Sequence, residues 1–190
     1  MLNKKFIKQL KADYDKHEGE RRQIISLSNQ VLHDSKRVIF SLHRNDLSIA
    51  EVSLKEIEEK LAYLDKKFGH SRLYEEGSFK AGMEEYVEAK MFFYVMSGKK
   101  IDKVAKVKID TESYLGGICD LTGEMVRLAI NKASRGQMDE VDKIKGVINE
   151  IMAELVLFDM TGYLRTKYDQ AKTNLRKIEQ IDYDIKIRRS

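Results

Sequence analysis

The chain of 190 residues contains no proline and has only one cysteine, Cys119. Proline interrupts helices and is common in turns, so its absence is typical of long helices joined by short connections. A single cysteine excludes an internal disulfide and a cysteine-rich metal site. We therefore predict a helical protein in which Cys119 is a small buried hydrophobic residue rather than a nucleophile.

The sequence also has little that indicates a membrane or export. No stretch is as long and as apolar as the roughly 20 residues that cross a bilayer. Residues 1–17 lack a continuous apolar segment followed by a small-residue cleavage site. With 42% hydrophobic and 35% charged residues, the composition fits a single domain over residues 1–190 with exposed helical faces. We expect a cytoplasmic protein with no membrane partner.

Helical periodicity recurs along most of the chain, whereas the alternation typical of strands is scarce. These patterns predict an all-α bundle of about six to seven long helices. Ser48 and Glu51 form a capping-box signature at the start of the second helix, and Gly19 is a point where the first helix could break. Residues 98–110 form a charged connection. The expected helices span about residues 3–45, 48–67, 74–97, 111–134, 138–158 and 162–187.

Two of these helices carry acidic residues among apolar ones. In the helix expected over residues 111–134, Asp120 and Glu124 lie one turn apart and share a narrow polar stripe with Arg127 and Asn131. Apolar side chains occupy about half of the circumference, which is more than an ordinary surface helix needs. The stripe therefore fits the lining of a groove or an internal cavity.

The helix expected over residues 74–97 has the same feature. Glu85 and Glu88 are three residues apart and share a side, which becomes apolar at Phe92, and Glu84 lies at the edge of the same arc. A side that becomes apolar along its length indicates that protein covers it. The pattern does not say whether this helix meets the one that carries Asp120.

Carboxylates without histidine or thiolate suit a hard cation such as Mg²⁺ or Mn²⁺. The four acids Glu85, Glu88, Asp120 and Glu124 are enough to hold one ion, partly through water, or two ions. Such an ion polarises a phosphodiester and supplies a hydroxide-like nucleophile. The alternative is that the acids are solvated, with Glu124 and Arg127 as a simple surface pair.

Residues 21–44 form an amphipathic helix with a basic strip opposite its apolar face. The net charge of +4 does not by itself indicate nucleic acid, so the distribution of charge must carry that argument. Cations along one face suit a phosphate backbone, although a solvated helix exterior would look the same. Only Phe40 interrupts the strip. Its cationic members are Arg22, Lys36, Arg37 and Arg44.

Other chemistries find no support in the sequence. There is no HExxH motif, no glycine-rich phosphate loop and no repeated Glu-x-x-His of a diiron bundle. We expect the four histidines at the surface or in a groove, and the methionines and aromatics of residues 91–96 in the core. The histidines are His17, His33, His43 and His70.

Four stretches in order resemble the translin family, and more closely its translin-associated factor X (TRAX) branch. The likeness runs from about residue 14 to the C-terminus, and a basic run typical of translin is not evident before residue 84. The stretches are "DSKRVIFSLHR" (34–44), "EEYVEA" (84–89), "DLTGEMVRLAIN" (120–131) and "KYDQAKTNLRKIEQIDYDIKIR" (167–188).

The resemblance implies a translin-like helical fold, assembly into a closed and roughly octameric homo-oligomer, and Mg²⁺-dependent endoribonuclease activity on RNA that is mainly single-stranded or in short duplexes. It also implies that the catalytic and metal-binding acids are Glu85, Glu88, Asp120 and Glu124. Basic positions on the first helix, best matched by Lys36, Arg37 and Arg44, would contact RNA. Two alternatives stay open: a non-catalytic shell that binds single-stranded RNA or DNA, and an acidic helical scaffold that binds metal only for assembly.

Overall fold

The computed structural model describes residues 1–189 and contains seven α-helices and no strand within that range, which confirms the prediction of an all-α bundle. The short helix α3 separates α2 from α4, and residues 98–110 connect α4 to α5 without helix. The helices are α1 (Lys4–His43), α2 (Leu47–Phe68), α3 (His70–Leu73), α4 (Gly77–Met96), α5 (Thr111–Ser134), α6 (Met138–Leu155) and α7 (Gly162–Arg189).

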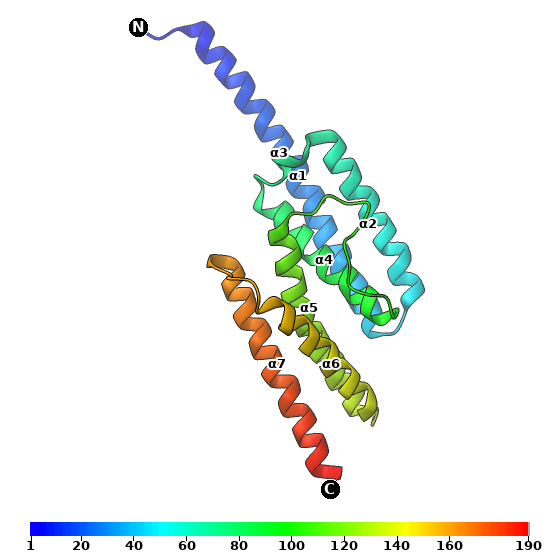
Figure 1. Cartoon of the computed structure of the whole chain (residues 1–190). Helices are drawn as coiled ribbons and strands as arrows, with labels where there is room; N and C mark the ends of the chain where they lie inside the picture. The colour runs from blue at the N-terminus through cyan, green and yellow to red at the C-terminus, as the bar shows by residue number, and fades with distance from the viewer. Residues whose placement is uncertain (190) are drawn as a thin grey trace.

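The helices form two groups that share the α4–α5 contact (Figure 1). Helices α1, α2 and α4 pack together at one end, and α5, α6 and α7 pack together at the other. The first part of α1 projects beyond the body of the molecule, where residues 1–17 are exposed. The contact between α4 and α5 therefore joins the two groups.

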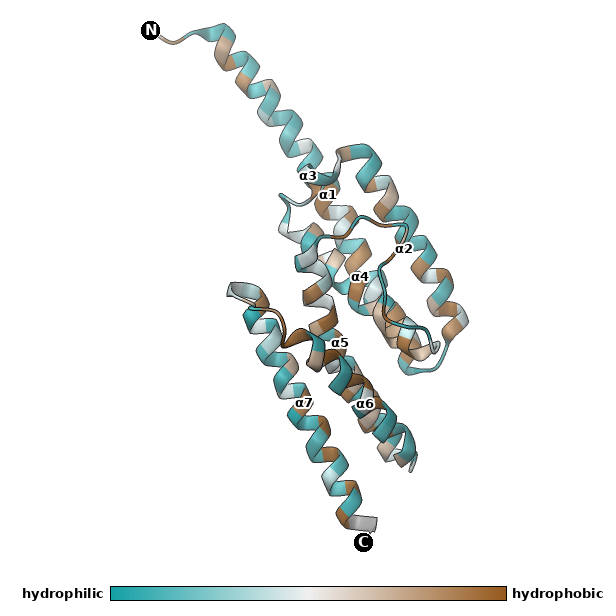
Figure 2. Cartoon of the chain, in the orientation of Figure 1, coloured by the Kyte–Doolittle hydropathy of each residue, from teal (hydrophilic) through white to brown (hydrophobic). Residues whose placement is uncertain are grey.

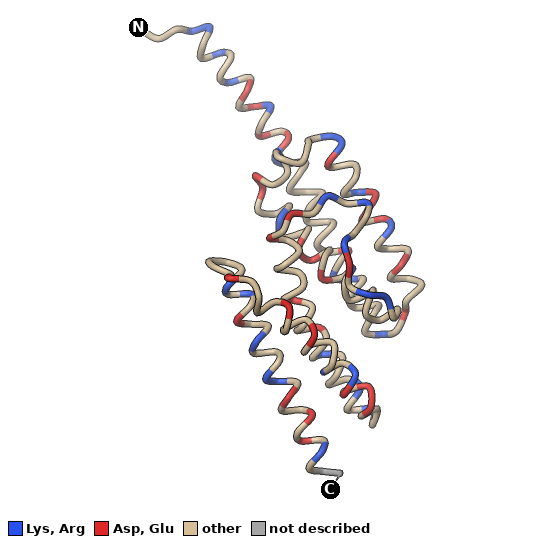
Figure 3. The backbone as a smooth tube through the Cα atoms, in the orientation of Figure 1, with Lys and Arg blue, Asp and Glu red and all other residues tan. Residues whose placement is uncertain are grey.

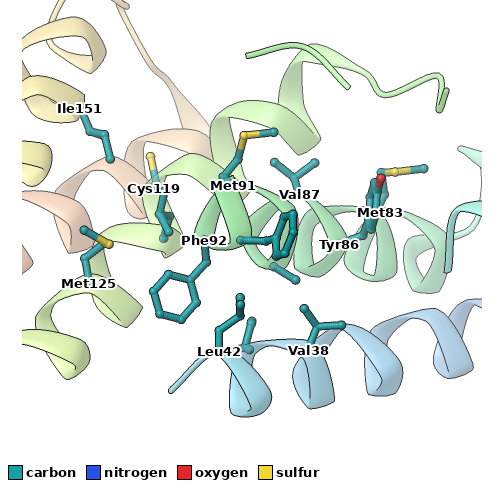
Figure 4. Packing of buried hydrophobic residues seen from close by; sticks show 14 of the residues in the cluster. Val38, Leu42, Met83, Tyr86, Val87, Met91, Phe92, Cys119, Met125 and Ile151 are labelled. Carbon is teal, nitrogen blue, oxygen red and sulfur yellow. The ribbon is translucent and has the colours of Figure 1, made fainter. Parts of the chain in front are cut away.

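The core lies where the hydrophobic stripes of the helices face one another (Figure 2). Figure 4 shows Val38 and Leu42 of α1 turned toward Tyr86 and Phe92 of α4, and all four side chains are fully buried. Burying a side chain of this size stabilises the fold by about 1.5–3 kcal/mol. Cys119 is 1% exposed, which confirms its prediction as a core residue.

Three local details differ from the sequence-based expectation. Helix α1 continues through Gly19 without a break, because a single glycine costs only about 1 kcal/mol in a helix that packing supports. Helix α2 starts at Leu47 after Asp46, so Ser48 lies inside the helix and forms no cap. The four-residue helix α3 was not predicted, because one turn is too short to show periodicity.

Two adjacent glycines bring α5 very close to α4. A Cβ atom on Gly117 would lie 2.7 Å from the Cβ atom of Val87 and 2.8 Å from the backbone oxygen of Glu84. A Cβ atom on Gly116 would lie 2.1 Å from a carboxylate oxygen of Glu84. A larger residue at Gly117 would meet backbone and force the two helices apart, whereas one at Gly116 would displace the Glu84 side chain, so the close approach of the helices depends on glycine at position 117.

Within residues 1–189, no helix has the length and apolar character needed to cross a membrane.

Candidate acidic site and adjoining basic strip

The α4–α5 contact brings the four predicted acids together. Glu85 and Glu88 lie on α4, Asp120 and Glu124 lie on α5, and all four are at least partly buried. Burial raises the pKa of both Glu85 and Glu88, and the negative charges of Asp120 and Glu124 raise it further, which requires the carboxyl groups to be close. The two acidic faces identified in the sequence therefore form one cluster.

Glu88 is the most strongly perturbed acid of this cluster. Burial, followed by the charges of Glu85, Asp120 and Glu124, raises the pKa of Glu88 from 4.5 to about 9. The residue is 8% exposed, and within the described chain no hydrogen bond or ion pair to its carboxyl group is found. At neutral pH and without a bound cation, Glu88 is therefore protonated.

Glu85 lies nearer to the surface than Glu88. Burial raises its pKa, and the positive charge of Lys36 on α1 acts in the opposite direction. Lys36 is thus the member of the basic strip that faces the acidic cluster.

Lys167 of α7 reaches into the cluster from the other side. Its Nζ atom lies 2.5 Å from Oδ2 of Asp120 and 2.7 Å from Oε1 of Glu84, and the hydroxyl of Tyr163 donates a hydrogen bond of 2.7 Å to the same Glu84 oxygen. Burial raises the pKa of Asp120, and the hydrogen bond from Lys167 offsets part of that rise. Burial would lower the pKa of Lys167, but Asp120 and Glu84 raise it, so the ammonium group stays charged.

His43 is the partner of Glu124. Its Nε2 atom donates a hydrogen bond to Oε2 of Glu124, because an ionised carboxylate can only accept. The side chain is 6% exposed, packs against Phe92 with ring centroids 5.0 Å apart, and leaves its buried Nδ1 atom without a partner. Burial would raise the pKa of Glu124, but His43 and Arg127 lower it. The prediction that His43 lies at the surface or in a groove is therefore wrong, because protein covers its side chain.

The cluster has the chemistry of a divalent cation site, although its side chains are not arranged as one. Within the described residues, no three His, Cys, Asp or Glu side chains are arranged as a ready metal site. Lys167 and His43 instead supply the positive charge on the α5 side. The buried carboxyl of Glu88, next to Glu85, has no such partner, and an oxygen-only donor set suits Mg²⁺ or Mn²⁺.

The predicted basic strip lies on α1, and its members are exposed as expected: Arg22, Lys36, Arg37 and Arg44. Arg37 is 3.8 Å from Asp34 and Arg44 is 3.5 Å from Asp46, so both cations have only long contacts with acids. Figure 3 shows acidic residues interspersed with basic ones along the long helices, so the strip is a local feature. Its place beside the acidic cluster follows from the effect of Lys36 on Glu85.

Comparison with known proteins identifies relatives of this chain. The model of the Translin family matches residues 19–189. The chain is 24% identical to translin-associated protein X of Pongo abelii, covering 98% of this chain and 78% of that protein. It is 26% identical to the translin-associated protein X homolog of Schizosaccharomyces pombe, covering 92% and 82%. A shorter match of 34% identity to translin of Gallus gallus covers 48% of this chain.

Solved structures have the same fold. The crystal structure of apo-NeC3PO matches with a TM-score of 0.84 at 24% identity, over 96% of this chain and 97% of that one. The complex of AfC3PO with duplex RNA matches with a TM-score of 0.83 at 21% identity, over the same shares of the two chains. The translin-like fold expected from the sequence is therefore confirmed.

Proposed function

The chain belongs to the Translin family, and from this we propose that it is an endoribonuclease that hydrolyses phosphodiester bonds of RNA with the help of Mg²⁺ or Mn²⁺. The observation that supports this most is the buried, unpartnered carboxyl of Glu88 in a cluster of four acids. The likeness to translin-associated protein X and to AfC3PO, whose structure in complex with duplex RNA is known, is consistent with RNA as the substrate. Mainly single-stranded RNA, or short duplexes with flexible ends, is the proposed substrate.

The residues of the site have separate roles in this proposal. Glu85, Glu88, Asp120 and Glu124 would hold the ion, directly or through water, and the ion would supply an activated water and polarise the scissile phosphate. Lys167 fixes the carboxylate of Asp120 by its ion pair of 2.5 Å.

Glu124 is held in place in the same way as Asp120. His43 fixes the carboxylate of Glu124 by its hydrogen bond. The basic strip on α1 would hold the RNA backbone beside the acids through its four cations. The strip consists of Arg22, Lys36, Arg37 and Arg44.

We also propose that the chain assembles into a closed homo-oligomer, an octamer in line with its family. The projecting part of α1 carries exposed Phe6, Leu10 and Tyr14 at four-residue spacing. A continuous apolar stripe of this kind marks a protein interface. Light scattering on the purified protein tests the assembly, and a monomeric mass at micromolar concentration would contradict it.

A second candidate function is a shell that binds RNA or DNA without cleaving it. The ion pair of Lys167 and the hydrogen bond of His43 favour it, because they occupy Asp120 and Glu124 without any metal. In that case the acids are structural, and nucleic acid binding persists unchanged in a chelator.

Cleavage of a labelled single-stranded RNA distinguishes the two candidates. We expect the wild-type protein to cut it with Mg²⁺ or Mn²⁺ and not with a chelator, and Glu88→Gln to lose cleavage by at least a hundredfold. Glu150→Gln is the matched control, because Glu150 is an exposed acid on α6. Cleavage that survives both chelation and Glu88→Gln would refute the metal mechanism. Tight binding without any cleavage by the wild-type protein would favour the second candidate.

A further inference from the structure

Phe40 is a large aromatic side chain left exposed within the basic strip. It is 56% exposed although it lies on a helix whose other hydrophobic residues in that region are buried. Lys36 and Arg44 lie one turn before and one turn after it, on a line that drifts by roughly 40° per step. The guanidinium of Arg44 is 5.9 Å from the centroid of the Phe40 ring, within the range of a cation–π contact.

The position of Phe40 relative to the acidic cluster follows from its neighbours on α1. Lys36, four residues earlier, is close enough to Glu85 to act on its pKa. His43, three residues later, forms a hydrogen bond with Glu124. Phe40 therefore lies along the edge of the cluster, between the contact to Glu85 and the contact to Glu124.

The neighbours of Phe40 also indicate what covers its ring. Phe6, on the projecting part of the same helix, is 60% exposed, with exposed Leu10 one turn later and exposed Leu2 just before the helix begins, an apolar setting that suits another protein surface. Phe40 instead has a lysine and an arginine at the equivalent positions. An aromatic ring between cations suits a nucleobase whose flanking phosphates contact those cations.

We propose that Phe40 is a stacking platform for an unpaired nucleobase, and that it gives the protein a preference for single-stranded RNA at the edge of the acidic cluster. The inference rests on the proposed function for the identity of the ligand, but it does not require cleavage. Bases in a closed duplex are already stacked, so a blunt duplex would gain nothing from the ring. Stacking on an aromatic side chain strengthens binding by roughly five- to hundredfold per base.

The chain contains no tryptophan, so Phe40→Trp introduces a unique indole fluorophore. We expect single-stranded oligouridine to quench its fluorescence in the presence of a chelator, because the base stacks on the indole. Inorganic polyphosphate, which has the charge but no bases, is expected to leave the fluorescence unchanged. Phe6→Trp is the control and is expected to respond to neither ligand. Equal quenching by oligouridine and polyphosphate, or no change at saturating oligouridine, would overturn the proposal.

A second measurement separates stacking from subunit contact. We expect Phe40→Leu to weaken binding of single-stranded RNA by about tenfold in a chelator, to change binding of a blunt duplex by less than about twofold, and to leave the oligomeric mass unchanged. A smaller oligomer with equal losses for both RNAs would mean that a second copy covers Phe40, and would refute the platform. Because both measurements are made without metal, a failure of the wild-type protein to cleave RNA counts against the nuclease and not against the platform.

Discussion

The acids on α5 and the acids on α4 differ in how their charge is compensated. Asp120 is paired with Lys167, and Glu124 is bonded to His43. On α4, burial and neighbouring negative charges raise the pKa of Glu85 and Glu88, and Glu88 is left protonated at neutral pH. Asp120 and Glu124 are thus compensated within the folded chain, whereas Glu85 and Glu88 remain available for a cation from solution.

The largest effect is expected from breaking the compensation on the α5 side. Lys167→Met leaves Asp120 and Glu84 partly buried without a counter-charge, and we expect it to reduce the free energy of unfolding by about 3 kcal/mol. Lys172→Met is the control, because its pair with Asp169 is exposed and is expected to be worth less than about 1 kcal/mol. Urea unfolding at pH 7 measures both. Equal effects of the two variants would contradict the assigned role of Lys167.

Glu88 and Glu124 are expected to respond with opposite signs to replacement by glutamine. Above pH 4.5 the unfolded chain releases the proton of Glu88 while the folded chain keeps it up to about pH 9, so stability falls as pH rises through this window. We therefore expect Glu88→Gln to stabilise the metal-free protein at pH 7 by about 2 kcal/mol and to flatten its pH dependence.

Glu124 gives the opposite sign because its pKa is lowered in the fold. Its contribution is present at neutral pH and is lost as pH falls through the folded pKa. Glu124→Gln is expected to destabilise by about 1 kcal/mol. Thermal unfolding of both variants in a chelator checks the comparison, and shifts of the same sign would show that the two helices do not differ in this way.

An effect of similar size is expected from separating α4 and α5. Gly117→Ala places a Cβ atom 2.7 Å from Val87, and we expect a loss of about 1–3 kcal/mol together with weaker metal binding. Gly146→Ala in α6 meets no atom within 4 Å and should instead stabilise by about 1 kcal/mol. Chemical unfolding of both variants tests this, and a neutral Gly117→Ala would mean that the α4–α5 spacing is not tightly fixed.

The smallest effect concerns the strip on α1. Lys36→Gln is expected to weaken single-stranded RNA binding by a few-fold and to reduce the slope of log affinity against log salt by about 0.7. Lys143→Gln on α6 is the control, since Lys143 is exposed and pairs with Glu140 within its own helix. Fluorescence anisotropy at several salt concentrations gives the slope for each variant. Identical slopes for Lys36→Gln and Lys143→Gln would show that Lys36 does not contact RNA.

The sequence predicted the helices and the two acidic faces because both depend on periodicity within a single segment. Glu85 with Glu88, and Asp120 with Glu124, are neighbours on their own helices. Lys167 and Tyr163 could not be identified in this way, because they reach the cluster from α7 and their own helix contains many other polar residues.

His43 was misjudged for a related reason. It lies at the boundary of the apolar face of α1, next to the buried Leu42, and only the position of Phe92 on another helix decides that the imidazole is covered. Periodicity within each helix predicted the acids, whereas the positive groups that pair with them could not be predicted because those pairs are tertiary contacts.

The most direct test of the acidic cluster is calorimetric titration of Mn²⁺ into metal-free protein at pH 7, in two buffers of different protonation enthalpy. Because Glu88 is protonated before the ion binds, the account predicts saturable binding with release of about one proton per ion, and neither in Glu88→Gln. Binding without proton release, or binding that is unchanged in Glu88→Gln, would contradict it.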